Sequence, residues 1–281
     1  MEDNLLEAIE EAEKKYQFLL KRSTTMNKKV LVERQDGVTV IMINRPDKHN
    51  CIDGETAQLL YDVWVDFRDD DEAKVAILTG NGSSFSSGAD LKAIDSLGPK
   101  NQYDADFAYD GKGYLGFTRM TDIFKPTIAA VNGYCFAGGL EMAAWCDIRI
   151  AAVDAEFGCL ERRWNVPLVD GGTQRIPRIV GWGRGMDLVL TGRRIDAQTA
   201  LDWGLVTEIV EPENLLARAK ELAFQMASYP QGSLRSDKQA AVRGWGLPLE
   251  EALRVECQLG MPHTRSEETW QGLNNFLNRK G

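Results

Sequence analysis

The chain has 281 residues, of which 43% are hydrophobic and 27% charged, and its formal net charge is −9. Length and composition are typical of a globular protein with a large core, built as one large domain or one domain with a smaller appendage. The acidic charge argues against binding of duplex nucleic acid, and no apolar run is long enough for a transmembrane helix, so we expect no membrane association.

The first 43 residues contain two predicted elements. Apolar residues recur at helical spacing in residues 1–25, which predicts a helical extension before the main fold, and its acidic composition is unlike a targeting peptide. The segments 30–34 and 38–43 flank Gln-Asp-Gly, a sequence that predicts a β-hairpin.

The middle of the chain alternates strands with helices. Asp53 is expected to cap a helix that runs to about Phe67. Residues 95–110 are polar and contain Gly and Pro, which predicts a flexible loop near the site. Buried strands are predicted at 75–80, 127–133 and 147–152, and further helices at 110–123 and 138–146.

After Gly171 the pattern becomes mostly helical, with one strand expected at 205–210. We therefore divide the chain into the extension 1–25, a core over 26–211 and a helical C-terminal region over 212–281. Helices are predicted at 172–180, 183–191, 197–203, 212–228, 233–243, 248–258 and 266–279.

The cysteine and histidine content limits the chemistry. Five widely spaced cysteines include no CxxC pair, which favours reduced thiols and a cytoplasmic location over a disulfide framework. Only two histidines occur, His49 and His263, both in polar loops. A His-rich metal site is not available, so we expect no metal and assign acid–base chemistry to carboxylates.

Two glycine-containing turns each follow a predicted buried strand: SSGADL at residues 86–91 and AGGLE at 137–141. Small residues allow backbone N–H groups to approach a ligand closely. Two such groups converging from separate turns would form an oxyanion hole, worth about 3–4 kcal/mol per donor. A helix that begins at the second turn would add positive potential there.

Five segments together resemble the crotonase (enoyl-CoA hydratase/isomerase) superfamily, and the resemblance covers roughly residues 29–281. They are NRPDKHN, FSSGADL, KPTIAAVNGYCFAGGLEMAAWCDIRIA, FGCLERRWNVPLVDGGTQRIPRIVG and TGRRIDAQTALDWGLVTEIV. The resemblance implies an α/β fold, a crotonase-like spiral of ββα units followed by a C-terminal helical region for oligomerisation. It also implies a homotrimer or homohexamer.

The resemblance further implies an acyl-CoA thioester as substrate, with coenzyme A as part of that substrate and no separate cofactor. The thioester oxygen would lie between the N–H groups of Ser87 and Gly138. Coenzyme A would run over the loop that contains Ser87, Gly88, Ala89 and Asp90, and the candidate basic contacts are Lys92, Arg279 and Lys280.

Glu141 and Glu161 match the two glutamates of the family, which points to an enoyl-CoA hydratase that adds water across a 2-enoyl double bond. Two carboxylates that bracket one water suit this reaction. We expect the helix dipole to keep Glu141 anionic, so that it activates water, and apolar neighbours to favour a protonated Glu161 that handles the α-proton. Arg162 and Arg163 would instead lower the pKa of Glu161.

Asp170 is a candidate third carboxylate. Dienoyl-CoA isomerases of the family carry an acidic residue at a similar place, but Asp170 could instead cap the helix that follows it, and the cap is the preferred interpretation. The alternative functions are an enoyl-CoA or dienoyl-CoA isomerase, or another acyl-CoA lyase or hydrolase. A non-catalytic RNA-binding or scaffold protein is disfavoured by the paired glutamates and the acidic charge.

Overall fold

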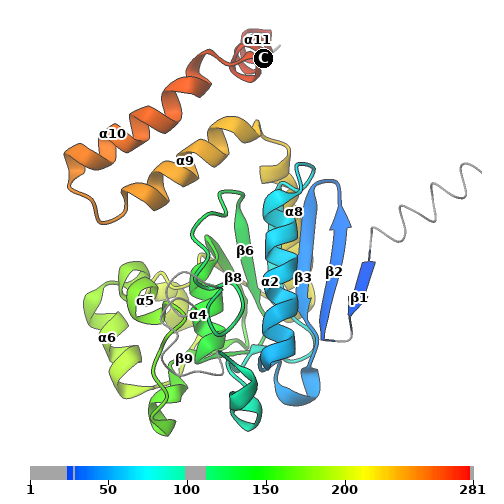
Figure 1. Cartoon of the computed structure of the whole chain (residues 1–281), viewed down its shortest axis with the longest axis vertical. Helices are drawn as coiled ribbons and strands as arrows, with labels where there is room; N and C mark the ends of the chain where they lie inside the picture. Colours follow the sequence, from blue (N-terminus) through cyan, green and yellow to red (C-terminus); the bar gives the residue numbers. More distant parts are fainter. Residues whose placement is uncertain (1–23, 28, 99–111, 279–281) are drawn as a thin grey trace, which may run out of the picture.

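The computed structural model describes residues 24–27, 29–98 and 112–278 of the chain. Two sheets and a set of helices form the mixed α/β architecture expected from the sequence (Figure 1). Residues 1–23 of the predicted helical extension lie outside the described residues. Its last two residues, 24 and 25, form the start of strand β1 instead of a helix. The predicted 95–110 loop is described only to residue 98.

A seven-stranded sheet forms the centre of the molecule, in the order β1-β2-β3-β4-β6-β8-β11. The first three strands pair antiparallel and the remaining pairs are parallel. Asp36 and Gly37 both have positive φ in the β2–β3 turn, which confirms the predicted hairpin. The strands are β1 (Thr24–Asn27), β2 (Val30–Gln35), β3 (Val38–Ile43), β4 (Val75–Gly80), β6 (Thr127–Val131), β8 (Ile148–Ala152) and β11 (Glu208–Val210).

Most of the predicted helices are confirmed, and α2 begins at its expected cap because Asp53 accepts a hydrogen bond from the N–H of Thr56. The α-helices are α2 (Gly54–Asp69), α4 (Gly138–Trp145), α5 (Gly172–Val180), α6 (Trp182–Thr191), α7 (Ala197–Asp202), α8 (Leu215–Ala227), α9 (Gln231–Gly244), α10 (Leu249–Gly260) and α11 (Glu267–Leu277). The 3-10 helices are η1 (Pro46–Lys48), η2 (Leu91–Ser96), η3 (Leu160–Trp164), η4 (Pro212–Asn214) and η5 (Met261–Arg265).

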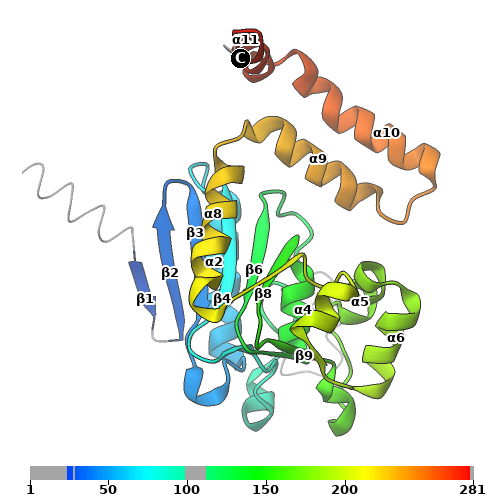
Figure 2. The same ribbon diagram turned by 180° about the vertical axis from the view of Figure 1, so that it is seen from behind.

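Side chains on the central strands alternate between two apolar cores, as the period of a strand requires. Leu78 of β4 lies in the core that also contains Trp64 of α2. Its neighbour Ile77 lies in the opposite core with Ala219 of α8. Figures 1 and 2 show these two helices on opposite faces of the sheet. Both faces are thus covered, which explains why every residue of β4 is buried.

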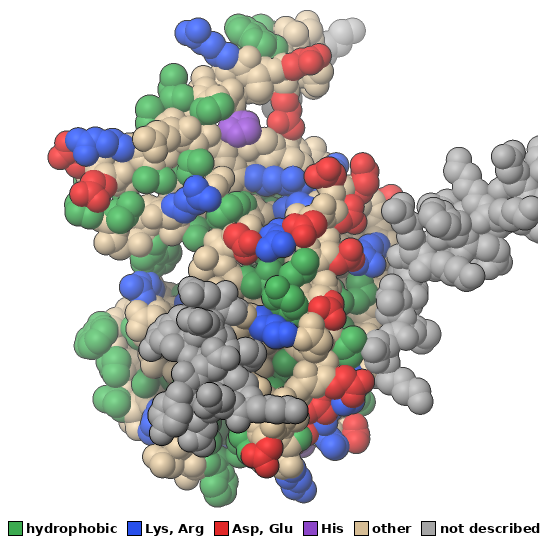
Figure 3. Space-filling model, in the orientation of Figure 1, with side chains coloured by type: hydrophobic (Ala, Val, Ile, Leu, Met, Phe, Trp, Pro, Cys, Tyr) green, Lys and Arg blue, Asp and Glu red, His purple; other side chains and the backbone are tan. Residues whose placement is uncertain are grey.

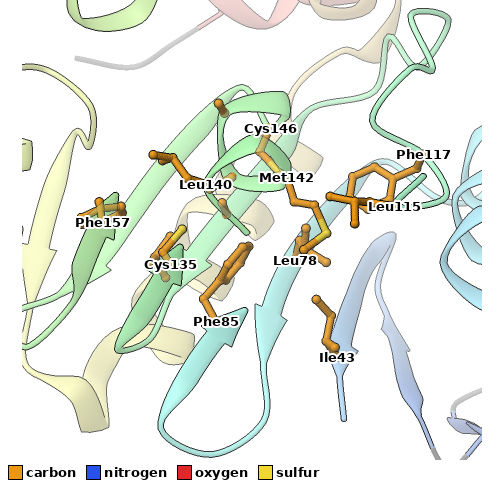
Figure 4. Close-up of a cluster of buried hydrophobic side chains, with 14 of the residues drawn as sticks. Ile43, Leu78, Phe85, Leu115, Phe117, Cys135, Leu140, Met142, Cys146 and Phe157 are labelled. Atoms are coloured by element: carbon orange, nitrogen blue, oxygen red, sulfur yellow. The ribbon is translucent and has the colours of Figure 1, made fainter. Parts of the chain in front are cut away.

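A smaller sheet has the order β10-β9-β7-β5, and β5, β7 and β9 are parallel to one another. Its side chains Phe85, Cys135 and Phe157 belong to the buried cluster that also contains Leu140 of α4 (Figure 4). The sequence pattern did not predict this sheet, because strands of two or three residues are too short to show a period. The strands are β5 (Ser84–Ser86), β7 (Tyr134–Phe136), β9 (Glu156–Gly158) and β10 (Ile195–Asp196).

The prediction of a helix over residues 110–123 is wrong for its described part, because residues 112–123 form turns and irregular structure. Gly113 and Gly116 both have positive φ there, at +75° and +95°. This left-handed backbone cannot continue a right-handed helix.

The C-terminal region is helical, as predicted, from η4 to α11. Helices α9 and α10 lie against each other, and Figure 1 shows this pair and α11 extending beyond the end of the large sheet. None of the helices in the described ranges is both long and apolar enough to cross a membrane.

Candidate active site

Three parallel strands of the small sheet bring the predicted site residues together. Because β5, β7 and β9 run in the same direction, the chain leaves all three at one edge. Strand β5 leads into the turn at residues 87–90, β7 leads into α4 with Glu141, and β9 leads into η3 with Glu161.

A cavity of about 510 Å³ lies at this edge. Much of its wall is apolar, with Leu97, Leu115 and Val166 among the contributing side chains. A concave apolar site with a few convergent polar groups is the usual form of a small-molecule site. Six residues predicted from the sequence line it: Ser87, Ala89, Gly138, Glu141, Glu161 and Asp170.

The two glycine turns meet at Gly88 and Gly138. Gly88 has a φ of +86°, and a Cβ added there would lie 2.6 Å from the backbone nitrogen of Gly138. A Cβ on Gly138 would lie 2.6 Å from a methyl of Leu115. Both positions therefore need glycine, which allows two backbone segments to meet at the cavity wall.

The structure corrects the expected donor in the first turn. The N–H of Ser87 donates a hydrogen bond of 2.9 Å to the carbonyl of His49, so it is not available to a ligand. Ile52 pairs with both neighbours of Ala89 instead, because its N–H binds the carbonyl of Gly88 and its carbonyl accepts from Asp90. Within the described chain, no hydrogen bond occupies the N–H of Ala89, which lines the cavity. The SSGAD motif located this turn, but residue type alone could not show which amide was free.

The second turn carries backbone strain. Ala137 precedes α4 with φ 52° and ψ −126°, a conformation that side-chain-bearing residues rarely adopt. Such strain persists where the surrounding structure enforces it, commonly at functional sites. The turn places Gly138 at the start of α4, so the N–H groups of the helix begin at the cavity.

Glu141 lies in the first turn of α4, with 3% of its surface exposed. Its Oε1 accepts hydrogen bonds from the N–H groups of Asp170 and Gly172, at 3.0 and 2.8 Å. Burial, and then the nearby Asp170 carboxylate, raise the pKa of Glu141 to about 8. The expectation that the helix dipole keeps this group anionic is therefore wrong, because desolvation outweighs the dipole.

Glu161 is also buried, and neither of its carboxylate oxygens accepts a hydrogen bond from another described residue. Burial raises its pKa, and the charge of Arg162 lowers it only in part. The arginines point elsewhere, since Arg162 donates to the carbonyl of Val189 and Arg163 to that of Gly192. A buried carboxyl without a partner is costly, so Glu161 has hydrogen-bonding capacity available for a ligand in the cavity.

Asp170 does not cap α5, contrary to the preferred sequence interpretation. The helix begins after Gly171 with no side-chain cap, and the Asp170 carboxylate points to another segment. Its Oδ1 accepts hydrogen bonds from the N–H of Leu115 and the hydroxyl of Thr118. Burial raises the pKa of Asp170. This side chain therefore contributes a third carboxylate to the cavity wall.

The remaining predicted contacts lie away from the cavity wall. Asp90 is buried against Arg45, at 2.9 Å, and Lys92 is exposed on η2. Arg279 and Lys280 lie outside the described residues. No group of three or more His, Cys, Asp or Glu side chains suited to a metal ion occurs in the described ranges.

The family described as enoyl-CoA hydratase/isomerase matches residues 33–281. The (E)-benzylidenesuccinyl-CoA hydratase of Thauera aromatica is 36% identical, over 89% of this chain and 96% of that protein. The short-chain-enoyl-CoA hydratase of Clostridium acetobutylicum is 34% identical, over 89% and 95%. The crystal structure of an enoyl-CoA hydratase from Mycobacterium tuberculosis H37Rv superposes with a TM-score of 0.82 at 32% identity, over 90% of this chain and 97% of that one.

Proposed function

The chain belongs to the enoyl-CoA hydratase/isomerase family, and on that premise we propose that it adds water across the double bond of a 2-enoyl-CoA thioester. The observation that supports this most directly is the single cavity shared by Glu141, Glu161 and the two glycine turns. The acyl-CoA is the substrate, and the reaction needs no further cofactor.

The first step is polarisation of the thioester. The N–H groups of Ala89 and Gly138 donate to the thioester oxygen, which gains negative charge as water attacks the β-carbon. Preoriented amides in a water-poor site stabilise such charge strongly, and they require no reorganisation during the reaction. The start of α4 adds positive potential at the same place.

The two glutamates manage the protons. An ionised carboxylate takes a proton from water while a protonated carboxyl supplies one to the α-carbon, so the pair must hold one proton between them. The pKa of Glu141, raised to about 8, makes it the carrier of that proton in the ligand-free site. Neither oxygen of Glu161 accepts a hydrogen bond from another described residue, so Glu161 is the group that accepts the proton of water. These roles are the reverse of those expected from the sequence.

The hydrogen bonding of the carboxylates favours hydration over isomerisation. An isomerase that used Asp170 would need this group free to move protons. One of its oxygens already accepts from Leu115 and Thr118. Glu161 lines the same cavity, and neither of its oxygens has a hydrogen-bond partner among the described residues.

The test is incubation of the purified chain with crotonyl-CoA. A hydratase removes the conjugated double bond, so the absorbance of the unsaturated thioester decreases and a 3-hydroxyacyl-CoA forms. An unchanged absorbance with crotonyl-CoA and with longer and aryl-substituted 2-enoyl thioesters would contradict the proposal. Conversion of a 3-enoyl-CoA without hydration would indicate an isomerase.

We further propose that the chain assembles as a homotrimer or homohexamer through its C-terminal helices. Large apolar side chains are exposed along this region, where Figure 3 shows hydrophobic atoms at the surface. Extended apolar surface of this kind marks an interface. Light scattering during size-exclusion chromatography would show the mass of a monomer if this is wrong. The exposed side chains include Trp245, Leu249, Leu253, Met261, Trp270, Phe276 and Leu277.

A further inference from the structure

A buried ion cluster lies behind the first glycine turn. Arg45 and Asp90 have 7% and 6% of their surface exposed, and Asp53 has 9%. Lys29 extends the cluster outward through a contact of 2.8 Å with Asp53. Buried charges are costly unless they are paired and hydrogen-bonded, and even a paired buried cluster is weak evidence for a gain in stability.

The guanidinium of Arg45 contacts three residues. One nitrogen, Nη2, lies 2.9 Å from an oxygen of Asp90 and 3.1 Å from an oxygen of Asp53. The other, Nη1, donates to the backbone carbonyl of Cys51. A planar, forked cation can hold two such groups in fixed relative positions, whereas a lysine ammonium acts as a single point charge.

Arg45 thus contacts Asp90, which follows Ala89, and Cys51, which precedes the residue that pairs with both neighbours of Ala89. Ile52, next to Cys51, donates to the carbonyl of Gly88 at 2.8 Å and accepts from the N–H of Asp90 at 2.7 Å. Arg45 therefore ties the segment that carries Ile52 to the residue after Ala89. The orientation of the Ala89 N–H depends on this pairing, because the peptide group is planar and both flanking residues are held.

Electrostatics gives the cluster a second consequence. Asp90 is the next residue after Ala89, so an unpaired carboxylate there would oppose the negative charge that develops on a thioester oxygen bound by the Ala89 N–H. Like charges repel strongly in a poorly solvated site. The charge of Arg45 offsets that of Asp90.

We propose that Arg45 is a positioning residue for the oxyanion hole: it fixes the turn that presents the Ala89 N–H and neutralises the carboxylate beside it. This inference rests on the proposed function, because it assumes that the Ala89 amide binds the thioester oxygen. Arg45 itself does not line the cavity, so it acts through the turn.

The test compares Arg45→Lys with Lys29→Met. Arg45→Lys keeps the charge but removes the fork, so we expect kcat to fall at least about tenfold while KM stays within about threefold. Lys29→Met removes a charge from the same cluster without touching the turn, and its kcat should equal that of the parent protein. Thermal unfolding of both variants shows whether stability changes in parallel.

A spectroscopic measurement separates positioning from a loss of folded protein. A cinnamoyl-CoA with an electron-donating ring substituent absorbs at longer wavelength when its carbonyl is polarised. Bound to Arg45→Lys, it should show a smaller shift than bound to the parent protein or to Lys29→Met. A smaller population of folded protein would reduce the amount bound but leave the shift of the bound probe unchanged.

The outcomes are distinct. A full shift in Arg45→Lys, or equal losses of kcat in both variants, would overturn the role of Arg45. A parent protein that shifts the probe but hydrates no enoyl-CoA would refute the proposed function, and the reduced shift in Arg45→Lys would still support the positioning role. Absence of any shift in the parent protein would refute both.

Discussion

In the seven-stranded sheet, β3, β4 and β6 are five or six residues long and are covered on both faces by apolar side chains. In the four-stranded sheet, each strand has only two or three residues. The long strands contribute apolar side chains to both cores, and burial of apolar surface is the dominant stabilising contribution to folding. Each short strand contributes fewer buried apolar side chains, but three of the short strands end at the cavity.

The difference shows how stability and chemistry are separated in this fold. Parallel strands end at one edge, so three short strands suffice to place two amide donors and two glutamates around one cavity. None of the described strands of the seven-stranded sheet contributes an amide donor or a carboxylate to the cavity wall. Changes in the small sheet and its turns should therefore affect turnover, and changes in the large sheet should affect stability.

The largest effect is expected for Glu161→Gln, just after β9. It removes the proposed base but keeps the shape of the side chain, so turnover of an enoyl-CoA should fall at least about a hundredfold. Stability should not decrease, because the buried carboxyl has no hydrogen bond from another described residue to lose. Steady-state kinetics and thermal unfolding measure the two quantities.

The matched control is Glu156→Gln, in β9 itself, which pairs with Arg194 rather than facing the cavity. Its turnover should equal that of the parent protein. Near-normal turnover in Glu161→Gln would remove this residue from the mechanism.

Gly88→Ala tests the contact between the two turns. A methyl group there would lie 2.6 Å from the Gly138 nitrogen and would push the proposed donor away, so kcat should fall about tenfold to a hundredfold. Gly246→Ala is the control, because this glycine has a similar φ of +88° but no atom within 4 Å of an added Cβ. Equal activities of the two variants would show that the turns need not meet.

The sequence predicted six of the seven strands of the large sheet and most helices, because their apolar runs or periodic patterns are long enough to recognise. It did not predict β1 (Thr24–Asn27). It also indicated both glycine turns, through small residues after predicted buried strands, and both glutamates, through the family resemblance. For Asp170 it preferred a helix cap, which is wrong. It could not identify Ala89 as the free amide, since that depends on the pairing of Ile52 with Gly88 and Asp90. It also misjudged the pKa of Glu141, because burial by distant segments is not visible in local sequence.

The pH dependence of stability tests the burial of Glu141. Its pKa rises from an ordinary value of 4.5 to about 8 in the folded chain. Between these values the unfolded chain loses the proton and the folded chain retains it, so stability falls as pH rises and the loss is complete above pH 8. Glu141→Gln lacks this loss, which is on the order of a few kcal/mol.

We therefore expect Glu141→Gln to gain stability relative to the parent protein as the pH increases from 4.5 to about 8, while its turnover is strongly reduced. Chemical denaturation at pH 5 and pH 8.5 would measure the difference. A constant difference across this range would mean that Glu141 is ionised in the folded chain.

The smallest effects are expected from substitutions of one buried apolar side chain in each sheet. Ile77→Val removes a methylene from β4 and should cost about 1 kcal/mol of stability with no change in kcat, because β4 contributes nothing to the cavity wall. Phe157→Leu removes apolar volume from β9, four residues before Glu161, and should also destabilise the fold by roughly 1–2 kcal/mol. In this variant kcat should fall severalfold as well, because β9 leads directly into the segment that positions Glu161. If both variants retained full kcat in their folded fraction, η3 would be positioned by its contacts with α6 rather than by the short strand, and the division between the two sheets would not hold.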